Sequence, residues 1–218
     1  MKNSDFEITD KIVRIPFLKR FFDILLSAIL ILPILPITLI IFIVYKSEGL
    51  IKPASRGPLF YTETRVSQGR PFKFRKFRIF KQAVLDEVLK NDGFIHTKPL
   101  ENKQDNLTYT GGFLKKFYLD ELPQIFSVFW GEMSFVGPRP WNLVDYKDEI
   151  ERGVYRKKVI KAGITGLVQV SKGFHKNDLL LDNQYIKFCR HNPNWKILLF
   201  DFKILGKSII VLLKGQGL

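Results

Sequence analysis

Cysteine is nearly absent from this 218-residue sequence, which contains only Cys189. A single thiol cannot form an internal disulfide or a cysteine metal cluster, so a reducing compartment suits the protein and Cys189 is interpreted as a packing residue. His175 and His191 have no Cys, Asp or Glu at metal-ligand spacing, and His96 is interpreted as a surface residue. These patterns argue against a zinc site.

Two phosphate-binding signatures are also missing. The sequence has neither a glycine-rich phosphate loop nor a dinucleotide-binding glycine fingerprint, so any nucleotide must be bound in another way. Acidic residues are scarce, with 21 Asp and Glu against 35 Lys and Arg, which gives a formal net charge of +14. Such a charge predicts an anionic partner, whether nucleic acid, anionic lipid or a phosphorylated substrate.

A long uncharged run extends from Ile24 to Tyr45. It follows a mixed polar segment, Met1 to Pro16, that lacks the cleavage site of a removable signal peptide, so we expect the amino terminus to be retained. The run reaches the roughly 20 residues that a helix needs to cross hydrocarbon. Basic residues flank both of its ends, so the positive-inside rule places both ends on the cytoplasmic side. These residues are Arg14, Lys19, Arg20, Lys46, Lys52 and Arg56.

Pro33 and Pro36 lie near the middle of this run. Each proline removes a backbone hydrogen bond and obstructs the preceding helical turn. The sequence therefore favours a broken, re-entrant membrane helix that bends near Pro36 and returns to the face it entered, with protein groups satisfying the freed carbonyls. A kinked helix that crosses the membrane once is the alternative.

The segment from Gly57 to Phe80 predicts a β-hairpin around a turn at Ser67-Gln68-Gly69-Arg70. A bulge at Arg75-Lys76 is needed to bring the phenylalanines of the second strand onto one face. The opposite face would then be basic, with Lys73, Lys76 and Arg78. This face could bind phosphates or lipid headgroups, or it could be a charged, solvated edge; the membrane segment disfavours single-stranded nucleic acid.

Two further helices are predicted. Lys81–Lys90 would form a short helix, followed by a polar loop from Asn91 to Thr110. Asn194–Leu213 is apolar with lysines on one narrow stripe, which is typical of a helix lying in the membrane interface with Trp195 near its end. Asp201 lies nearly opposite this stripe, so we expect it to pair with a cationic residue of the protein.

Adjacent carboxylates, Asp120 and Glu121, precede Pro123 and an apolar helical run. Proline suits the first turn of a helix, where backbone N–H groups and the positive end of the helix dipole gather. This environment keeps carboxylates ionised, and with a divalent cation it can bind a phosphorylated substrate. The alternative is that the two acids only cap the helix.

Prolines on both sides of Arg139 predict a stiff loop that presents a permanently charged, fork-shaped donor. Stiffness lowers the entropy lost when such a donor binds phosphate, although a structural ion pair with a carboxylate is the alternative and is compatible with it. The segment from Gly163 to Val170 is interpreted as a glycine-hinged strand or tight loop near this site.

Taken together, these motifs resemble the bacterial sugar transferases, specifically the small monotopic phosphoglycosyl transferases, from about Lys19 to Gly217. The resemblance is carried by Lys19-Arg20-Phe21-Phe22-Asp23, Lys76-Phe77-Arg78, Leu119 to Gln124, Gly131 to Pro140, Gly163 to Leu167 and Asp182-Asn183-Gln184-Tyr185. Several positions depart from the family pattern. Lys115 stands where Arg is usual, Leu35 precedes Pro36 instead of Ser, Ala162 replaces a Pro, and Ile79-Phe80 replaces a more polar pair.

The resemblance implies transfer of a sugar 1-phosphate from a UDP-sugar to polyprenyl (undecaprenyl) phosphate, with release of UMP, as the first step of a surface glycan or glycoconjugate. Asp120 would be the nucleophile that forms an aspartyl-phosphosugar intermediate, and Glu121 would assist it. Mg²⁺ would be bound by Asp120, with Glu121 as a second candidate ligand. The residues implied to bind substrate or phosphate are Lys76, Arg78, Lys115, Arg139, Gln169, Asp182 and Tyr185.

The fold implied is α+β and predominantly helical, with a small β-hairpin and interfacial amphipathic helices around a compact cytosolic catalytic domain. The expected organisation is an N-terminal cytosolic or interfacial segment (1–18), a re-entrant membrane helix (19–46) and the catalytic domain (47–218). The chain is expected to start directly at the membrane element, without the extra transmembrane region of larger relatives. The expected location is the cytoplasmic face of the bacterial inner membrane, on anionic phospholipid. A homodimer remains open, and no nucleic-acid partner is expected.

Three other functions compete with this hypothesis. A catalytically silent scaffold would use the basic face and the terminal helix to bind anionic lipid. A nucleic-acid-binding protein would show steeply salt-dependent affinity. A phosphohydrolase would use the same carboxylates and release free sugar phosphate without polyprenyl phosphate.

Overall fold

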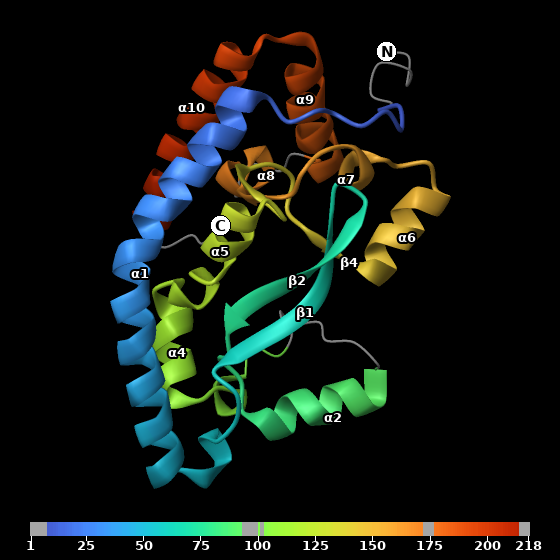
Figure 1. The fold of residues 1–218 in the computed structure, drawn as a ribbon. Coiled ribbons are helices and arrows are strands. Elements are labelled where there is room, and N and C mark those ends of the chain that lie inside the picture. Colours follow the sequence, from blue (N-terminus) through green and yellow to red (C-terminus); the bar gives the residue numbers. More distant parts are fainter. Residues whose placement is uncertain (1–7, 93–99, 101–102, 172–176, 214–218) are drawn as a thin grey trace. The chain divides into compact units, whose positions relative to one another are not determined.

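The computed structural model describes residues 8–92, 100, 103–171 and 177–213. The chain divides into two compact units. The first unit is drawn from Met1–Ala28, Glu63–Phe74 and Ile125–Leu218, and the second unit from Ile29–Thr62 and Arg75–Gln124. Helices predominate, and the strands are few and short except for one hairpin (Figure 1), as the sequence predicted.

Helix α1, Phe17–Ile51, contains the predicted membrane segment and is longer at both ends than the predicted 19–46. It is the one helix in the described part of the chain that is long and apolar enough to cross a membrane. At 1.5 Å per residue it is about 52 Å long, which exceeds the roughly 30 Å of hydrocarbon in a bilayer. The helical assignment continues through Pro33 and Pro36, so the predicted break does not divide it into two helices.

Strands β1 (Phe60–Ser67) and β2 (Arg70–Phe77) form the predicted hairpin. Its two turn residues, Gln68 and Gly69, both have positive φ angles of 50° and 72°. Two successive positive φ angles define a type I′ turn, whose twist matches that of the flanking strands. Strand β4 (Trp141–Asn142) adds to β1 in antiparallel register, with Val66 opposite Trp141, and gives a sheet of order β2-β1-β4.

A second, parallel pair in the first unit was not predicted as a sheet. Strand β3 (Ser134–Val136) pairs with β5 (Gly163–Thr165), with Ser134 opposite Gly163. The pairing requires glycine, because a Cβ at Gly163 would lie 2.1 Å from the backbone nitrogen of Gly137 and one at Gly166 would lie 2.3 Å from the Gly137 carbonyl oxygen. The interpretation of Gly163 to Val170 as a strand is confirmed for its first three residues, and helix α8 (Leu167–Val170) follows.

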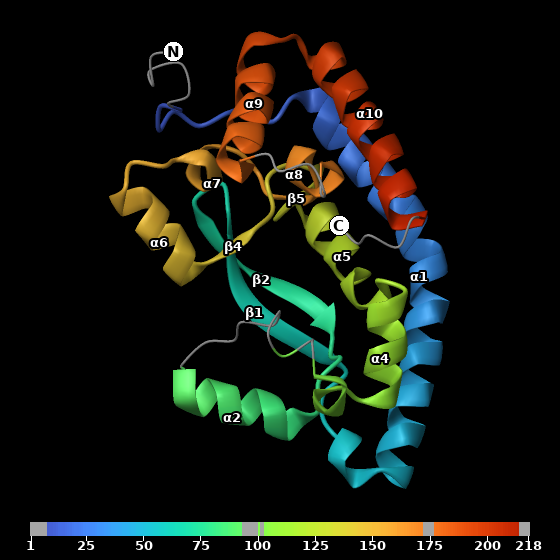
Figure 2. The same ribbon diagram turned by 180° about the vertical axis from the view of Figure 1, so that it is seen from behind.

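The remaining helices of the first unit surround these strands. Helix α10, Asn194–Leu213, has the predicted bounds and buries a stripe that includes Ile197, Asp201 and Ile204. Its lysines and much of its apolar surface are exposed, and it lies alongside the first turns of α1 in Figures 1 and 2. The other helices are α5 (Gln124–Trp130), α6 (Leu143–Glu151), α7 (Arg156–Val159) and α9 (Asp178–His191).

Polar residues at the start of α1 join these elements. The Lys19 ammonium lies 2.5 Å from Asp201 Oδ2 and donates to the carbonyl of Val136 at 2.9 Å. The Tyr185 hydroxyl donates to Asp201 Oδ1 at 2.7 Å. The prediction that Asp201 pairs with a cationic residue is confirmed. Cys189 is buried, and burial raises the pKa of its thiol to about 12, which agrees with a packing role.

The second unit has its own apolar core, formed by Ile41, Phe77, Ile79, Phe80, Leu85 and Leu114. Helix α2, Gln82–Asp92, confirms the predicted helix at 81–90. The described part of the predicted loop from 91 to 110 contains a 3₁₀ turn, Gln104–Asn106, and the start of helix α4, Tyr109–Lys116. Short 3₁₀ turns also occur at Pro53–Ser55 (η2) and Leu119–Glu121 (η4). His96 and His175 lie outside the described residues.

Candidate active site

The carboxylates of Asp120 and Glu121 lie on a tight turn in the second unit. Helix α4 ends at Lys116, Tyr118 adopts a left-handed conformation with φ of 56°, and η4 (Leu119–Glu121) follows. A positive φ is uncommon for a bulky residue and is kept only where the surrounding structure stabilises it. Leu119 and Leu122 pack against the apolar core on either side of the acids and hold the turn against it.

Asp120 and Glu121 have different environments on this turn. Asp120 is only 7% exposed, whereas the carboxylate of Glu121 receives a hydrogen bond from the ammonium of Lys76, with Nζ 2.7 Å from Oε1. Two predicted site residues that are 45 positions apart in the sequence are thus brought together. The pairing places a cation beside the two acids, in a charge-assisted hydrogen bond.

Helix α4, which leads into the turn, is fixed at its beginning by Glu48 from α1. The Glu48 carboxylate accepts hydrogen bonds from the backbone N–H groups of Tyr109 (2.9 Å) and Thr110 (2.8 Å) and from the Thr110 hydroxyl (2.5 Å). These are the N–H groups that the first turn of a helix leaves unpaired. A Cβ at Gly111 would lie 2.1 Å from the carbonyl oxygen of Ile79, so α4 packs closely against the chain that follows β2.

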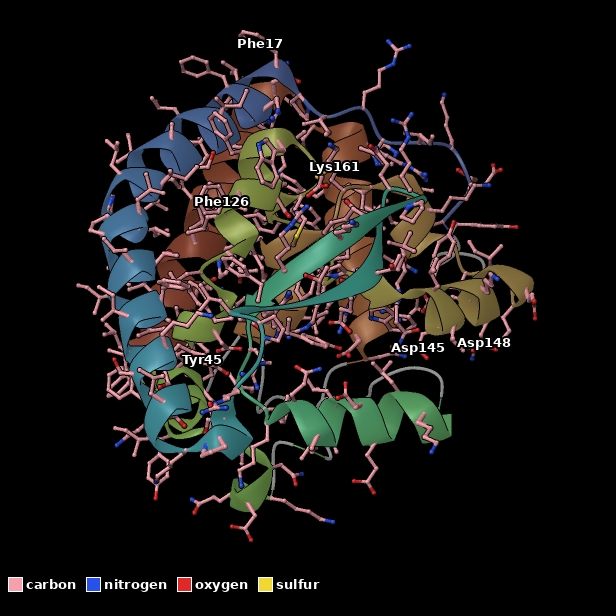
Figure 3. The ribbon with its side chains drawn as sticks, turned by 60° about the horizontal axis from the view of Figure 1, so that its bottom comes forward. Phe17, Tyr45, Phe126, Asp145, Asp148 and Lys161 are labelled. Carbon is pink, nitrogen blue, oxygen red and sulfur yellow. The ribbon has the colours of Figure 1, made fainter. Side chains whose placement is uncertain are left out.

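The structure corrects the predicted basic face at Arg78. Its side chain is fully buried at 0% exposure. The guanidinium donates to the carbonyls of Pro58 (2.9 Å), Ser55 (2.8 Å) and Phe80, and it lies over the ring of Tyr45, a residue of α1 labelled in Figure 3. These contacts leave Arg78 no open face for a phosphate, so in this structure it joins the loop before β1 to the chain that follows β2. Lys73 is exposed and Lys76 is half-buried.

Arg139 lies in the first unit on the loop between β3 and β4, where it is half-buried between two buried prolines. The carbonyl of Pro138 accepts from Gly163 N–H at 2.9 Å, and the carbonyl of Pro140 accepts from the Arg65 guanidinium at 2.8 Å. Hydrogen bonds on both sides of Arg139 therefore support the stiff loop that the sequence predicted. Lys115, in the second unit, is half-buried in the last turn of α4.

Asp182 and Tyr185 are buried in the first unit, where both bind protein groups. Asp182 Oδ2 accepts from Arg156 at 3.0 Å and from Lys157 at 2.9 Å, and burial lowers the pKa of Lys157 even though Asp182 opposes the shift. Tyr185 binds Asp201, and burial is the main reason that its pKa is raised. Their contacts are those of a buried ionic and hydrogen-bonded core.

Gln169 differs from these two residues. It is fully buried in α8, and neither its amide nitrogen nor its amide oxygen has a hydrogen-bond partner within the described part of the chain. A buried amide without a partner is costly, so such a group normally binds an ordered water or a ligand. Whether Gln169 binds substrate, as the resemblance implies, stays a prediction.

Sequence reasoning missed several residues that position the acid pair. Glu48 gave no signal, because an acid near the end of an apolar helix is expected to face water. Tyr118 could not be recognised either, since glycine and asparagine are the usual left-handed residues.

In the first unit, the contacts of Arg20 explain a basic residue in the motif Lys19-Arg20. Arg20 donates to the carbonyls of Val128 (2.7 Å) and Phe129 (2.8 Å) at the end of α5, where a cation complements the helix dipole.

The described part of the chain thus has one helix long and apolar enough to cross a bilayer, and a buried acid next to a lysine-paired acid. The chain belongs to the bacterial sugar transferase family, whose sequence profile matches residues 14–215. It is 36% identical over 212 residues to the undecaprenyl-phosphate galactose phosphotransferase of Salmonella typhimurium, which covers 92% of this chain and 41% of that protein.

Two other relatives differ in the share of their length that this chain covers. Identity is 34% over 204 residues to the UDP-glucose:undecaprenyl-phosphate glucose-1-phosphate transferase of Escherichia coli, covering 88% of this chain and 39% of the relative. It is 31% over 209 residues to the exopolysaccharide production protein ExoY of Sinorhizobium fredii, covering 91% of this chain and 87% of the relative. The chain thus spans about two-fifths of the length of the two transferases and most of the length of ExoY.

Proposed function

We propose that this protein transfers a sugar 1-phosphate from a UDP-sugar to polyprenyl phosphate and releases UMP. The observation that carries the proposal is the acid pair on the η4 turn, with Asp120 buried and Glu121 bound to Lys76. The family match and the names of the relatives support the same reaction. The product would begin a surface glycan or glycoconjugate.

In the first step, a carboxylate oxygen of Asp120 attacks the phosphorus that bears the sugar. A new bond forms between this oxygen and phosphorus, and the bond from phosphorus to the bridging oxygen breaks, so that UMP leaves with that oxygen. The product is an aspartyl-phosphosugar, a covalent intermediate that divides the transfer into two displacements.

In the second step, a phosphate oxygen of polyprenyl phosphate attacks the same phosphorus. The bond between phosphorus and the Asp120 oxygen breaks, which regenerates the carboxylate and leaves polyprenyl-diphosphate-sugar. A strong general base is not needed, because a phosphate monoester with a second pKa near ~6 is already largely dianionic at neutral pH.

The charged residues around the acids contribute electrostatically. The Lys76 ammonium holds Glu121 in place and can counter phosphate charge as it shifts toward UMP. Lys115 supplies a second cation in the same unit, as a point charge without the bidentate fork of arginine. Arg139 is proposed to bind phosphate, because its fork-shaped donor lies on a loop that is held by hydrogen bonds on both sides.

The residues present are compatible with Mg²⁺. Within the described ranges no cluster of three or more His, Cys, Asp or Glu could hold a metal by itself. Mg²⁺ does not require such a cluster, because it commonly takes one or two carboxylates and completes its octahedron with water and substrate phosphates. Asp120 and Glu121 are the acids that would hold it, and the ion would neutralise the diphosphate charge.

The proposed location is the cytoplasmic face of a bacterial inner membrane that contains anionic phospholipid. The length and exposed apolar surface of α1 support membrane association, and basic residues on both sides of its apolar run support entry and exit at one face. The exposed lysines and apolar residues of α10 suit a helix in the interface.

The test is UMP release from a panel of UDP-sugars by the full chain in detergent or nanodiscs, with Mg²⁺ and polyprenyl phosphate each added or omitted. Release that requires Mg²⁺ and Asp120, with transfer of the sugar phosphate to the lipid, supports the proposal and names the donor. Free sugar phosphate formed without polyprenyl phosphate would indicate a phosphohydrolase. Unchanged activity of Asp120→Asn would exclude the proposed nucleophile.

A further inference from the structure

Two side chains near the end of α1 contact the elements that lead to the acid pair and to its lysine. Tyr45, labelled in Figure 3, is 4% exposed, and Glu48 is half-buried three residues further along the helix. Residues at this spacing share one side of a helix. Ile41, one turn before Tyr45, belongs to the apolar core of the second unit. The last turns of α1 are therefore packed into this unit.

Glu48 binds the beginning of α4 with both of its carboxylate oxygens. Oε1 accepts from the N–H of Tyr109, and Oε2 accepts from both the N–H and the hydroxyl of Thr110. A glutamine in this position would have the same shape but only one acceptor oxygen, and its NH₂ group would face a donor. The start of α4 therefore requires a carboxylate at position 48.

Tyr45 binds the chain at the end of β2. Its hydroxyl donates to the carbonyl of Arg78 at 2.9 Å, and the Arg78 guanidinium lies over its ring, with Cζ 4.9 Å from the centroid. The same guanidinium donates to the carbonyl of Ser55, whose hydroxyl donates to Glu48 Oε1 at 2.6 Å. Hydrogen bonds and a ring contact thus connect Tyr45 to Glu48 through Arg78 and Ser55.

The two elements that α1 holds meet again at the pair of Lys76 and Glu121. Lys76 lies in β2, two residues before Arg78, and Glu121 lies five residues beyond the end of α4. Nζ and Oε1 of this pair are 2.7 Å apart, and a shift of about 1 Å between the two elements would break the hydrogen bond. The position of α4 against β2 therefore determines whether this contact forms.

We infer that Glu48 is a positioning residue for the acid pair and that Tyr45 assists it. Glu48 acts through the backbone of α4, and Tyr45 acts through the carbonyl of Arg78. Together they fix α4 against β2, and this spacing fixes the contact of Lys76 with Glu121 beside Asp120. The geometric part of the inference stands without any reaction, whereas its effect on catalysis rests on the proposed function.

The first test measures the reactivity of the Lys76 amine in the folded protein. Full-length protein in detergent, held well below its unfolding temperature, is methylated with limiting formaldehyde and borohydride, and each lysine is followed by mass spectrometry. A carboxylate partner keeps Lys76 protonated and slow to react, so its methylation in Glu48→Gln should be roughly threefold faster than in wild type. Lys90, an exposed lysine of α2 in the same unit, should react at an unchanged rate.

The matched control is Glu87→Gln, which removes the same charge from an exposed position of α2. It should leave Lys76 as slow as in wild type. Tyr45→Phe keeps the ring but removes the hydroxyl, and it should accelerate Lys76 in the same direction by a smaller factor. This variant decides the matter if Glu48→Gln does not fold. A role in stability alone would leave the reactivity of Lys76 in the folded protein unchanged, and that result would overturn the inference.

The second test is a double-mutant cycle of sugar-phosphate transfer. Glu48→Gln should lower kcat/KM about tenfold in the wild-type background but less than about twofold in Lys76→Met, where the contact through which Glu48 acts is already absent. Equal losses in the two backgrounds, or no loss in either, would overturn the effect on catalysis. A wild type that transfers no sugar phosphate would instead contradict the proposed function, and the reactivity of Lys76 would still decide the positioning role.

Discussion

The ammonium of Lys76 lies 2.7 Å from the carboxylate oxygen of Glu121, and this pair joins the hairpin strand β2 to the turn that carries Asp120. The side chains are 14% and 22% exposed, so the pair is partly shielded from water. Lys76 and Glu121 come from different sequence motifs, so neither motif alone predicts that they pair. Its position suggests that Lys76 orients Glu121 in addition to any contact that it makes with phosphate.

A double-mutant cycle tests this coupling. Lys76→Met and Glu121→Gln should each lower kcat/KM of sugar-phosphate transfer by roughly 10²-fold, because each removes part of one electrostatic arrangement. The kcat/KM of the double variant should be only slightly lower than that of the less active single variant, since the effects of residues that act together are not additive. Lys73→Met, an exposed lysine of the same strand, is the control and should stay within about threefold of wild type. Fully additive losses would show that the two residues act separately.

Gly111 and Gly112 provide a matched pair on α4. A Cβ at Gly111 would lie 2.1 Å from the backbone oxygen of Ile79, whereas a Cβ built at Gly112 has, beyond its own helix, no atom of the described residues within 4 Å. Gly111→Ala should lower the free energy of unfolding by about 1–3 kcal/mol and displace the helix that leads to Asp120. Gly112→Ala should be neutral or stabilising by up to ~1 kcal/mol, because alanine favours the helix. Thermal unfolding and transfer activity measure both, and equal behaviour of the two variants would contradict the close packing.

The buried pair of Lys19 and Asp201 should be costly to break. Lys19→Met leaves the carboxylate without its ammonium, and a buried pair that loses one partner typically costs about 3–5 kcal/mol. The double variant Lys19→Met with Asp201→Leu should recover much of this loss, since no unpaired charge remains. Chemical denaturation in detergent compares the three proteins. A double variant that is less stable than Lys19→Met would indicate that the pair contributes through geometry and not through charge compensation.

Lys161, labelled in Figure 3, gives a prediction for pH. Burial lowers the pKa of this lysine from its ordinary 10.5, and repulsion by Arg20 adds to the shift. The folded state therefore releases the proton at a lower pH than the unfolded state, so between the lowered pKa and 10.5 this group makes folding more favourable as pH rises. Lys161→Met should be more stable than wild type at neutral pH, and its advantage should shrink as pH rises toward 10.5. Denaturation curves across that range give the difference in free energy of unfolding between the two proteins. A difference that stayed constant with pH would contradict the prediction.

Elements with strong local signals were predictable from the sequence. The turn at Gln68-Gly69, the helix at Asn194–Leu213 and a cationic partner for Asp201 followed from periodicity, turn chemistry and the cost of burying a charge. The carboxylate motif was also found, although the acids lie on a 3₁₀ turn before α5 and not within a helical first turn.

Features that depend on distant contacts were not predictable. Arg78 was assigned to an exposed basic face because alternation places it there, but its guanidinium donates to two carbonyl groups of the loop before β1, 20 and 23 residues away, and to the nearby carbonyl of Phe80. The parallel pairing of β3 and β5 requires the close approach of Gly137 and Gly163, which no local pattern specifies. The Tyr109 N–H that donates to Glu48 is likewise 61 residues away.

The most direct measurement concerns the covalent intermediate. Wild-type protein and Asp120→Asn are incubated with the preferred UDP-sugar radiolabelled in the β-phosphate, with Mg²⁺ but without polyprenyl phosphate, and the denatured protein is assayed for bound label. The proposed chemistry predicts label on Asp120 of the wild type, one UMP released per labelled site, loss of label when polyprenyl phosphate is added, and no label on Asp120→Asn. The two-step account would be contradicted by a wild type that transfers sugar phosphate to polyprenyl phosphate at full rate but, without this acceptor, neither binds label nor releases UMP.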